Sequence, residues 1–436
     1  MAYLNGGIWA LGNGMVSTTL ILYLALDRFD SRSIGLGIGL LLALPKVIGT
    51  LRLVAPPMIG RLARKKEFCL GAYMLSALTL LTLVPITVGA FSEGPTALAM
   101  LIAVWGVFHL LEYMGTIALW SWLADVAPAR IRGRFIGRRQ RWMIVGEIVA
   151  LLASGGLVWL WQACTVKESH PIGYMISSTI GIGLLLIALL PLCRMSRSRP
   201  RGRNAGRVVD SGLSLRALLA PLGDSVYLRF LAAGIFFSLA CGITQTPQSC
   251  FPRYVLGLPL IAALSLKVGL RMGQLPLAPW VGRMADRLGN LPVMAIGMLI
   301  AATGPLFFIP AASHSAYWII GAQAAWIAWI GVNVAQPNLL LKLSPRGADT
   351  PHIAIFFAIT GLVWAMAATA GGWLYDMTDH GRAVLLTLPT VGDIDYYTYA
   401  FLAGWILRTL SAVLLVALMW RPLRGASSPS PWEGRP

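Results

Sequence analysis

Seven charged side chains lie within long apolar stretches of this 436-residue chain. They are Lys46, Arg52, Glu112, Glu147, Lys267, Arg271 and Arg408. Placing such a group in the middle of a membrane helix costs about 2.5–3.5 kcal/mol, so a charge at that depth indicates a function or a partner. Two kinds of chemistry follow from these residue types. Cations can bind an anion, and a buried carboxyl group can exchange a proton.

Lys46 and Lys267 lie at matching distances from two glycine-containing loops. At about 1.5 Å per helical residue, Lys46 lies about 21 Å before Gly60, and Lys267 lies about 22 Å before Gly282. Both positions are deeper than half of the hydrocarbon core, which is about 15 Å. Arg271 follows Lys267 by one turn on the same helix face. We interpret the three cations as solute-binding residues, although pairing of the lysines with Glu112 or with carbonyl groups is an open alternative.

Glu112 lies about 12 Å before the end of its apolar segment at Trp120, and it is our candidate proton carrier. His109 lies on roughly the same face and is either a relay partner or a packing residue. Glu147 follows the basic residue Arg141 closely, which favours a role in gating. We interpret Arg408 as structural.

Amide side chains in the apolar segments are further candidates for contact with a polar solute. We assign Asn13, Gln245 and Asn333 to the solute site. An amide in a low-dielectric interior needs a hydrogen-bond partner, and another helix supplies one as readily as a solute does. Hydrogen bonding between helices therefore explains each of these amides equally well.

The composition defines the elements that must position these residues. The chain is 57% hydrophobic and 12% charged, whereas soluble domains are roughly 45–50% apolar and about 25% charged. This excludes a soluble globular protein. Twelve segments are long enough to cross a bilayer as helices, since a crossing needs about 20 apolar residues. We predict them at 3–26, 34–57, 69–90, 96–120, 142–163, 172–193, 228–250, 258–281, 291–312, 317–341, 352–374 and 397–420.

The net charge of +18 is a topology signal rather than a sign of nucleic-acid binding. Basic residues gather in every second loop, at 61–66, 130–141, 194–216, 283–287, 342–346 and in the tail. Such loops are cytoplasmic by the positive-inside rule. Both termini are then inside, and we expect a multi-pass protein of the bacterial inner membrane.

The chain divides into two halves that repeat one another. We predict a six-helix bundle at 1–193, a basic linker at 194–227 compatible with a short amphipathic helix, a second bundle at 228–420 and a tail at 421–436. The loop APPMIGRLARKKEF of the first half matches APWVGRMADRLGN of the second in its Pro, Gly and Arg positions. Duplicated bundles around a central site are common among transporters.

Two motifs resemble those of the major facilitator superfamily. GRMADRLG (282–289) resembles the loop after the second and eighth spans, and WSWLADVAPARIRGRFIGRRQRW (120–142) resembles the loop after the fourth. The resemblance implies an all-α membrane protein of two pseudo-symmetric six-helix bundles, with gating charges in these loops. The residues that match as gating positions are Gly60, Arg61, Asp125, Arg132, Arg134, Gly282, Asp286 and Arg287, and Glu147 is added to them because it closely follows Arg141. The first half departs from the pattern at Arg64, where the family's loop usually carries an acid.

The residues together predict a secondary transporter that moves a small polar solute by alternating access. The cations favour an anionic solute, and Glu112 favours proton coupling. Export of drug-like amphipathic compounds is the alternative, followed by a membrane sensor of the same fold. No P-loop, HExxH or GxSxG pattern occurs, so we expect no enzyme activity, catalytic residue, metal or cofactor. The expected partners are the solute and lipid, without nucleic acid, for a monomeric chain. Whether Cys164 and Cys250 pair is left open.

Overall fold

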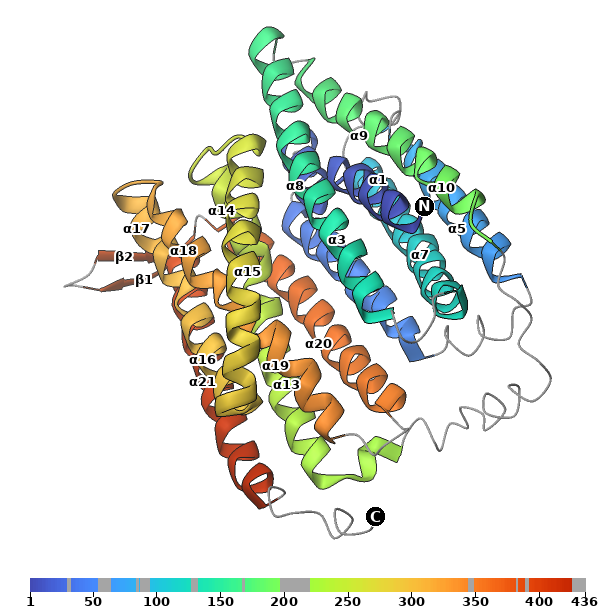
Figure 1. The fold of residues 1–436 in the computed structure, drawn as a ribbon. Coiled ribbons are helices and arrows are strands. Elements are labelled where there is room, and N and C mark those ends of the chain that lie inside the picture. Colours follow the sequence, from blue (N-terminus) through green and yellow to red (C-terminus); the bar gives the residue numbers. More distant parts are fainter. Residues whose placement is uncertain are drawn as a thin grey trace, which may run out of the picture. The chain divides into compact units, whose positions relative to one another are not determined.

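The computed structural model describes residues 1–29, 33–53, 64–83, 86, 95–126, 132–166, 169–196, 220–343, 349–381, 383–388 and 392–425, which are almost entirely helical (Figure 1). Eleven stretches in this part are long and apolar enough, by length and composition, to cross a membrane. They coincide with eleven of the twelve predicted segments, so the chain is a multi-pass membrane protein. The remaining segment, 69–90, holds α5 (Lys65–Leu80), and much of its second half lies outside the described residues. The count of twelve and the cytoplasmic termini stay predictions.

In their described residues, the first six predicted segments correspond to eight α-helices and a 3₁₀ turn. They are α1 (Ala2–Met15), α2 (Thr18–Arg28), α3 (Ile34–Ile48), η1 (Gly49–Leu53), α5, α7 (Pro95–Val126), α8 (Arg132–Cys164), α9 (His170–Ile187) and α10 (Leu189–Cys193). The first predicted span is broken between α1 and α2. There the Ser17 hydroxyl accepts a hydrogen bond from the Leu20 amide at 3.3 Å and starts α2 as an N-cap.

The second half has the same character with more breaks. Its elements are η5 (Ala220–Gly223), α13 (Ser225–Ile243), α14 (Gln245–Tyr254), α15 (Leu260–Leu288), α16 (Asn290–Ala302), η6 (Gly304–Phe307), α17 (Phe308–Ser313), α18 (Trp318–Ile327), α19 (Trp329–Leu343), α20 (Asp349–Met377), β1 (Val384–Leu388), β2 (Gly392–Asp395) and α21 (Tyr396–Gly425). Asp224 caps α13 by accepting from the Val226 amide at 2.8 Å. Most of the predicted amphipathic helix of the linker lies outside the described residues.

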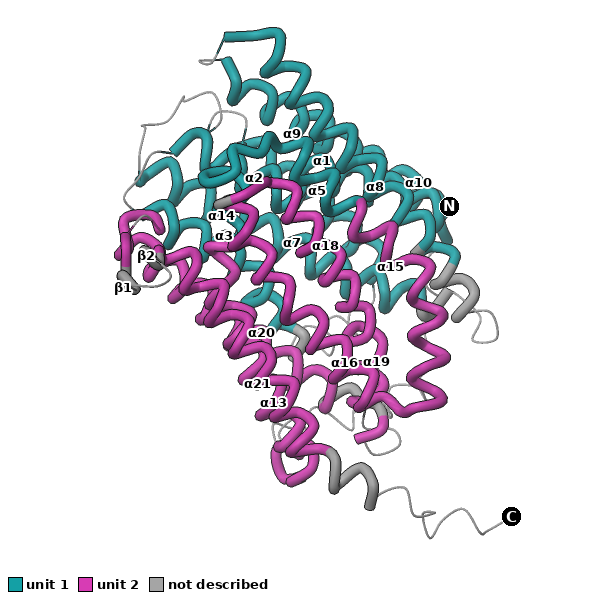
Figure 2. Tube along the Cα trace, turned by 90° about the vertical axis from the view of Figure 1, so that its left-hand side faces the viewer, with its two compact units in different colours: residues 1–213, 249–268 teal, residues 214–248, 269–436 magenta. Residues whose placement is uncertain are grey.

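The chain forms two compact units (Figure 2). The first contains Met1–Leu213 and Ser249–Val268, and the second contains Ser214–Gln248 and Gly269–Pro436. The boundary therefore runs through α14 and α15. The end of α14 and the start of α15 come from the second half of the sequence, yet they pack with the helices of the first half.

Helices at corresponding positions in the two halves of the sequence form the same packing pairs. In the first, α1 packs on α8 and α9, and α5 packs on α7. In the second, α13 packs on α20 and α21, and α16 packs on α19. Counted in predicted spans, the pairs one–five, one–six and three–four recur as seven–eleven, seven–twelve and nine–ten. This correspondence supports the internal repeat read from the loop motifs.

Glycine permits the tightest of these contacts in both units. A Cβ on Gly146 of α8 would lie 2.5 Å from the Gly7 carbonyl oxygen of α1, and a Cβ on Gly242 of α13 would lie 2.5 Å from the Trp364 carbonyl oxygen of α20. No side chain fits at such a separation. Small residues therefore set the helix–helix distance here, as is usual in membranes.

The motif at 282–289 differs from the sequence-based expectation. We predicted a loop after residue 281, but α15 continues through Gly282, Asp286 and Arg287 to Leu288. The turn is made at Gly289, whose φ of 91° lies in the region that glycine adopts without strain. Two internal prolines do not end α15, because neighbouring groups in a membrane protein can satisfy the carbonyls that a proline releases.

A β-hairpin is the one element outside the all-α expectation in the described part of the chain. β1 and β2 pair antiparallel, with Leu386 opposite Ile394 and Thr387 opposite Asp393. They lie between the predicted spans 352–374 and 397–420, in a loop that the predicted topology places on the outer side.

Candidate functional site

Glu112 lies in the interior of α7 and is held by a hydroxyl group. The Thr116 hydroxyl, one turn further along, donates to Glu112 Oε1 at 3.1 Å, and His109 Nδ1 lies 4.0 Å from Oε2. The side chains of His109 and Glu112 are 19% and 17% exposed. Within the described residues, no lysine or arginine lies within ion-pair distance of Glu112. Pairing of Glu112 with a lysine, the alternative left open above, is therefore not seen among the residues that the structure describes.

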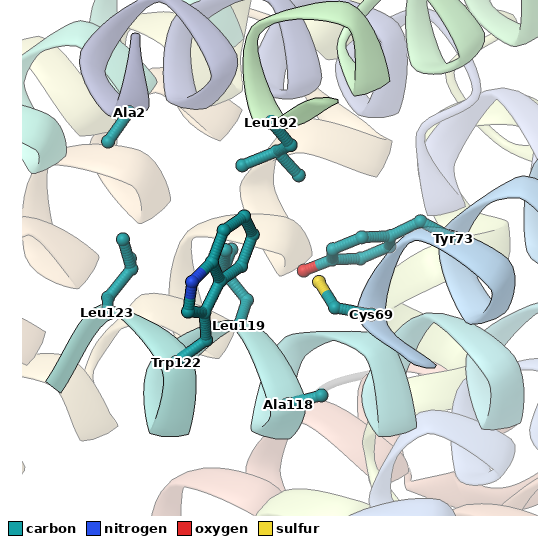
Figure 3. Close-up of a cluster of buried hydrophobic side chains, with 8 residues drawn as sticks. All are labelled: Ala2, Cys69, Tyr73, Ala118, Leu119, Trp122, Leu123 and Leu192. Atoms are coloured by element: carbon teal, nitrogen blue, oxygen red, sulfur yellow. The ribbon is translucent and has the colours of Figure 1, made fainter. Parts of the chain in front are cut away.

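A second hydroxyl extends this chain of hydrogen bonds to α5. Tyr73 Oη lies 2.9 Å from Thr116 Oγ1. Gly115 makes room for the tyrosine, because a Cβ there would lie 3.0 Å from the ring. The ring belongs to a buried cluster that includes Cys69, Trp122 and Leu192 (Figure 3). The chain Glu112–Thr116–Tyr73 therefore orients the carboxyl group.

His109 is placed by aromatic packing. Its ring lies edge-on to Trp105 with centroids 4.4 Å apart, and 5.0 Å from the Phe108 centroid. Its Nε2 atom is buried without a hydrogen-bond partner among the described residues. These contacts fit the packing interpretation of His109, and its position beside Glu112 keeps the relay interpretation open.

The predicted solute-binding cations lie on two helices. Lys46 is exposed on the last turn of α3, and Lys267 and Arg271 are exposed on α15. The Lys267 ammonium group donates a hydrogen bond to the Thr19 hydroxyl of α2, a buried side chain. Convergence of all three cations on one cavity stays a prediction.

The predicted amides differ in their exposure. Asn333 is exposed, whereas Asn13 and Gln245 are half-buried. Two other amides show the alternative role, which is hydrogen bonding between helices. Asn5 donates to the Ala188 carbonyl at 2.9 Å, and Asn338 donates to Asn290 Oδ1 at 3.3 Å, so both connect helices.

The predicted gating residues are described only in part. Gly60 and Arg61 lie outside the described residues. Asp125 lies on α7, and Arg132 and Arg134 lie on α8, but their side chains are outside the description. Glu147 is half-buried on α8. Asp286 and Arg287 are exposed on α15 and form no ion pair with a described side chain. Their gating role stays a prediction.

The structure contains an ion pair near the ends of α2 and α14 that the sequence did not predict. Arg253 Nε donates to Asp27 Oδ1 at 2.7 Å. In the predicted topology both residues lie in loops on the outer side. One local signal existed: Thr19, Tyr23 and Asp27 recur at four-residue intervals and so share a helix face. The partner lies 226 positions away and has no such signal.

Cysteines and metals add no site in the described part of the chain. Cys164 is an exposed thiol and Cys250 a buried thiol, so the two do not form a disulfide. No group of three or more His, Cys, Asp or Glu side chains among the described residues could hold a metal ion.

No protein-family model and no curated protein matches the chain in sequence. Solved transporters share its fold. The D-xylose–proton symporter has a TM-score of 0.68 at 15% identity, over 95% of both chains. The nucleoside transporter NupG has a TM-score of 0.62 at 15% identity, over 96% of both chains. A POT family transporter in complex with 5-aminolevulinic acid has a TM-score of 0.63 at 11% identity, over 96% of both chains.

At these identities the likeness shows the fold. It agrees with the all-α membrane fold that the resemblance of the two loop motifs implies. The three proteins are transporters.

Proposed function

We propose that this chain is a secondary transporter that carries a small polar solute across the membrane by alternating access. The shared fold and the recurrence of helix pairs in the two units support this proposal. No nucleotide-binding loop pattern occurs in the sequence, so the driving force is a gradient of the solute or of a coupling ion.

The environment of the Glu112 side chain is the main support for proton coupling. This carboxyl group lies in an apolar helix with a hydroxyl and an imidazole beside it, and no described cation within ion-pair distance. A carboxyl group without a fixed counter-ion changes its protonation when its access to water changes. Glu112 therefore binds and releases the coupling proton, and Thr116 and Tyr73 hold it in position.

The solute is anionic in this proposal. Lys46, Lys267 and Arg271 supply positive charge, and Asn13, Gln245 and Asn333 supply hydrogen bonds. Lys267 donates a hydrogen bond to the hydroxyl of Thr19, which is a neutral group. A carboxylate or phosphate group of the solute is a stronger partner for an ammonium group than a neutral hydroxyl is.

A drug-like substrate would need aromatic surface that is free to bind it. Two tryptophans of the apolar segments, Trp105 and Trp326, are used in packing. Trp105 is 1% exposed against His109, and the Trp326 ring covers Gly304. This favours the polar solute over export of amphipathic compounds.

The test is uptake by proteoliposomes of organic acids, phosphorylated compounds, sugars and drugs, with and without a pH gradient. We expect an acidic solute to accumulate. Lys267→Met should lower its uptake by about tenfold, the effect of about 1.4 kcal/mol of binding energy. Lys342→Met, at an exposed lysine on the last turn of α19, is the matched control and should leave uptake unchanged.

Glu112→Gln separates coupling from binding. We expect it to abolish stimulation by the pH gradient and to retain exchange of labelled for unlabelled solute, because exchange needs no net proton movement. Accumulation of neutral but not acidic solutes would refute the anionic assignment. If no compound class is taken up and none binds, transport itself is refuted.

A further inference from the structure

The turn that follows α20 places a histidine between two carboxyl groups. His380 Nε2 lies 3.7 Å from Asp376 Oδ1, and His380 Nδ1 lies 4.0 Å from Asp379 Oδ1. The His380 side chain is 31% exposed, whereas those of Asp376 and Asp379 are 12% and 79% exposed. His380 Nε2 is buried without a hydrogen-bond partner among the described residues. A neutral imidazole carries one N–H group and a protonated one carries two, so only the protonated ring can attract both carboxylates.

The backbone of this turn has a conformation that most side chains avoid. Asp379, His380 and Gly381 have successive φ values of 50°, 57° and 82°. Glycine adopts such values without strain, and other residues visit this region singly rather than in runs. A turn of this kind persists only when its surroundings hold it.

Three tyrosines pack behind the turn. A Cβ on Gly381 would lie 2.7 Å from Tyr397 Cε2 and 3.1 Å from Tyr375 Cε2, so the turn lies directly on both rings. The hydroxyl groups of Tyr375 and Tyr397 lie 2.8 Å apart, and the Tyr396 hydroxyl donates to a carbonyl group of α20 at 3.4 Å. The Tyr375 ring is edge-on to His380, with centroids 6.0 Å apart. Phenol groups are neutral between pH 5 and 8, so these contacts do not change with pH.

The charges described around His380 come from its own turn. Within the described residues, its ion pairs are those with Asp376 and Asp379. On β2, Asp395 accepts a hydrogen bond from an amide of the first turn of α21 at 2.8 Å, which fixes its carboxyl group at that helix end. The side chains of Arg382 and Asp393 lie outside the description.

The turn is also the base of the β-hairpin. The Ala383 amide donates to the Thr378 carbonyl at 3.0 Å, and the Tyr396 amide donates to the Ala383 carbonyl at 3.2 Å. β1 begins directly after Ala383, and β2 ends directly before Tyr396. Both ends of the hairpin are therefore joined to the turn that contains His380.

We propose that His380 is a proton switch that sets how firmly this hairpin is held on the end of α20. At acidic pH the imidazolium attracts Asp376 and Asp379 and closes the turn. At higher pH the neutral ring loses this attraction, and the strained turn and the hairpin open more often. Histidine is the side chain that ordinarily changes charge between about pH 5 and 8. The attraction exists only in the protonated form, so acid favours the closed turn.

The predicted topology places this loop on the outer side, so the switch responds to the pH outside the membrane. It goes beyond the transport function proposed above. The groups that form it all lie in the second compact unit, between Tyr375 and Tyr397.

Hydrogen–deuterium exchange of the purified full chain in detergent tests the switch. Exchange of the peptide covering residues 381–396 is followed by mass spectrometry at pH 5.5 and 7.5 and corrected for the intrinsic effect of pH on amide exchange. We expect protection to be about threefold higher at pH 5.5, the size of effect that a partly exposed ion pair gives.

His380→Gln cannot become charged and should exchange at both pH values as the wild type does at pH 7.5. Asp376→Asn removes the less exposed carboxylate and should lose most of the pH response. Asp379→Gly should keep most of it, because an exposed carboxylate contributes little and glycine accepts the φ of 50°. His314→Gln is the matched control, because His314 is exposed after α17 on the same predicted side; it should respond like the wild type.

Equal protection of the wild-type hairpin at both pH values would overturn the switch, and so would complete exchange at both, because the hairpin would then not be held at all. A full pH response in His380→Gln would overturn it as well. Peptides from α13 report whether each variant is folded. If His380→Gln loses their protection, Asp376→Asn decides, and a full response in that variant would overturn the switch.

Glu112→Gln separates the switch from proton coupling. We expect the hairpin of this variant to respond to pH as in the wild type, because the pair of His380 and Asp376 is local. Loss of the response in Glu112→Gln would overturn the switch, since pH would then act on the hairpin through Glu112. Failure of transport in every uptake assay with an intact hairpin response would refute the proposed function alone.

Discussion

Arg408 shows how this chain holds a buried cation that has no acidic partner among the described residues. Its side chain is 3% exposed, and Nη2 donates to the Thr244 hydroxyl at 2.7 Å. Thr244 is the C-cap residue of α13, so the bond ties the end of that helix to α21. The contact agrees with the structural role inferred from the sequence.

Thr244→Val should therefore destabilise the protein. Valine has nearly the shape of threonine but lacks the hydroxyl group that accepts from Arg408. Loss of a hydrogen-bond partner costs about 1–3 kcal/mol at a buried site. We expect a lower midpoint of thermal unfolding in detergent. Thr303→Val is the control, because Thr303 is also a C-cap residue but its hydroxyl bonds only to the nearby Ile300 carbonyl. Equal effects of the two substitutions would argue against the Arg408 contact.

Side-chain partners were predictable only where they are local. Thr116 follows Glu112 by one helical turn, so their hydrogen bond is readable from spacing. Arg139 is the opposite case. The sequence places it among loop bases, but it is 4% exposed, with Nη2 3.5 Å from Asn5 Oδ1 of α1 and its guanidinium group 5.3 Å from the Trp120 ring centroid. Its burial depends on how α8 packs against α1, which no local pattern reveals.

At the scale of the helices, the α1–α8 contact makes a direct prediction for Gly146. Gly146→Ala places a methyl group 2.5 Å from the Gly7 carbonyl oxygen, so the helices must move apart. Overpacking of this kind costs about 1–3 kcal/mol. Gly183→Ala in α9 is the matched control, since a Cβ there meets nothing within 4 Å.

We expect Gly146→Ala to lower the unfolding midpoint in detergent. Gly183→Ala should be neutral or slightly stabilising, because alanine favours a helix over glycine by about 1 kcal/mol. The reverse order of the two variants would show that α1 and α8 do not pack as closely as described.

Helix positions were largely predictable, and helix ends were not. Hydropathy located eleven stretches correctly because burial in lipid demands a continuous apolar run. Hydropathy made the predicted segments too short wherever a helix extends beyond its apolar run. α8 begins at Arg132 and α15 ends at Leu288, since arginine is a good helix former outside the membrane as well.

At the scale of the whole molecule, the predicted topology places the C-terminus inside and the segment of β1 and β2 outside. A peptide tag inserted between Leu388 and Gly392 should be detected by antibody on intact cells. A tag after Pro436 should be detected only after permeabilisation. Detection of the C-terminal tag on intact cells would exclude an even number of spans with a cytoplasmic N-terminus.

The sequence by itself determined the class of the molecule, the order of its apolar helices and the repeat of its loop motifs. These properties depend on local composition, because each helix must satisfy its own backbone and its own contact with lipid. Tertiary structure alone decided which polar groups meet. Tyr73 reaches the Glu112 site from another helix, and Arg253 reaches Asp27 across 226 positions of the chain. Such pairs depend on the rotation and spacing of packed helices, which are set by contacts such as Gly146 on Gly7 and leave no periodic trace in the sequence.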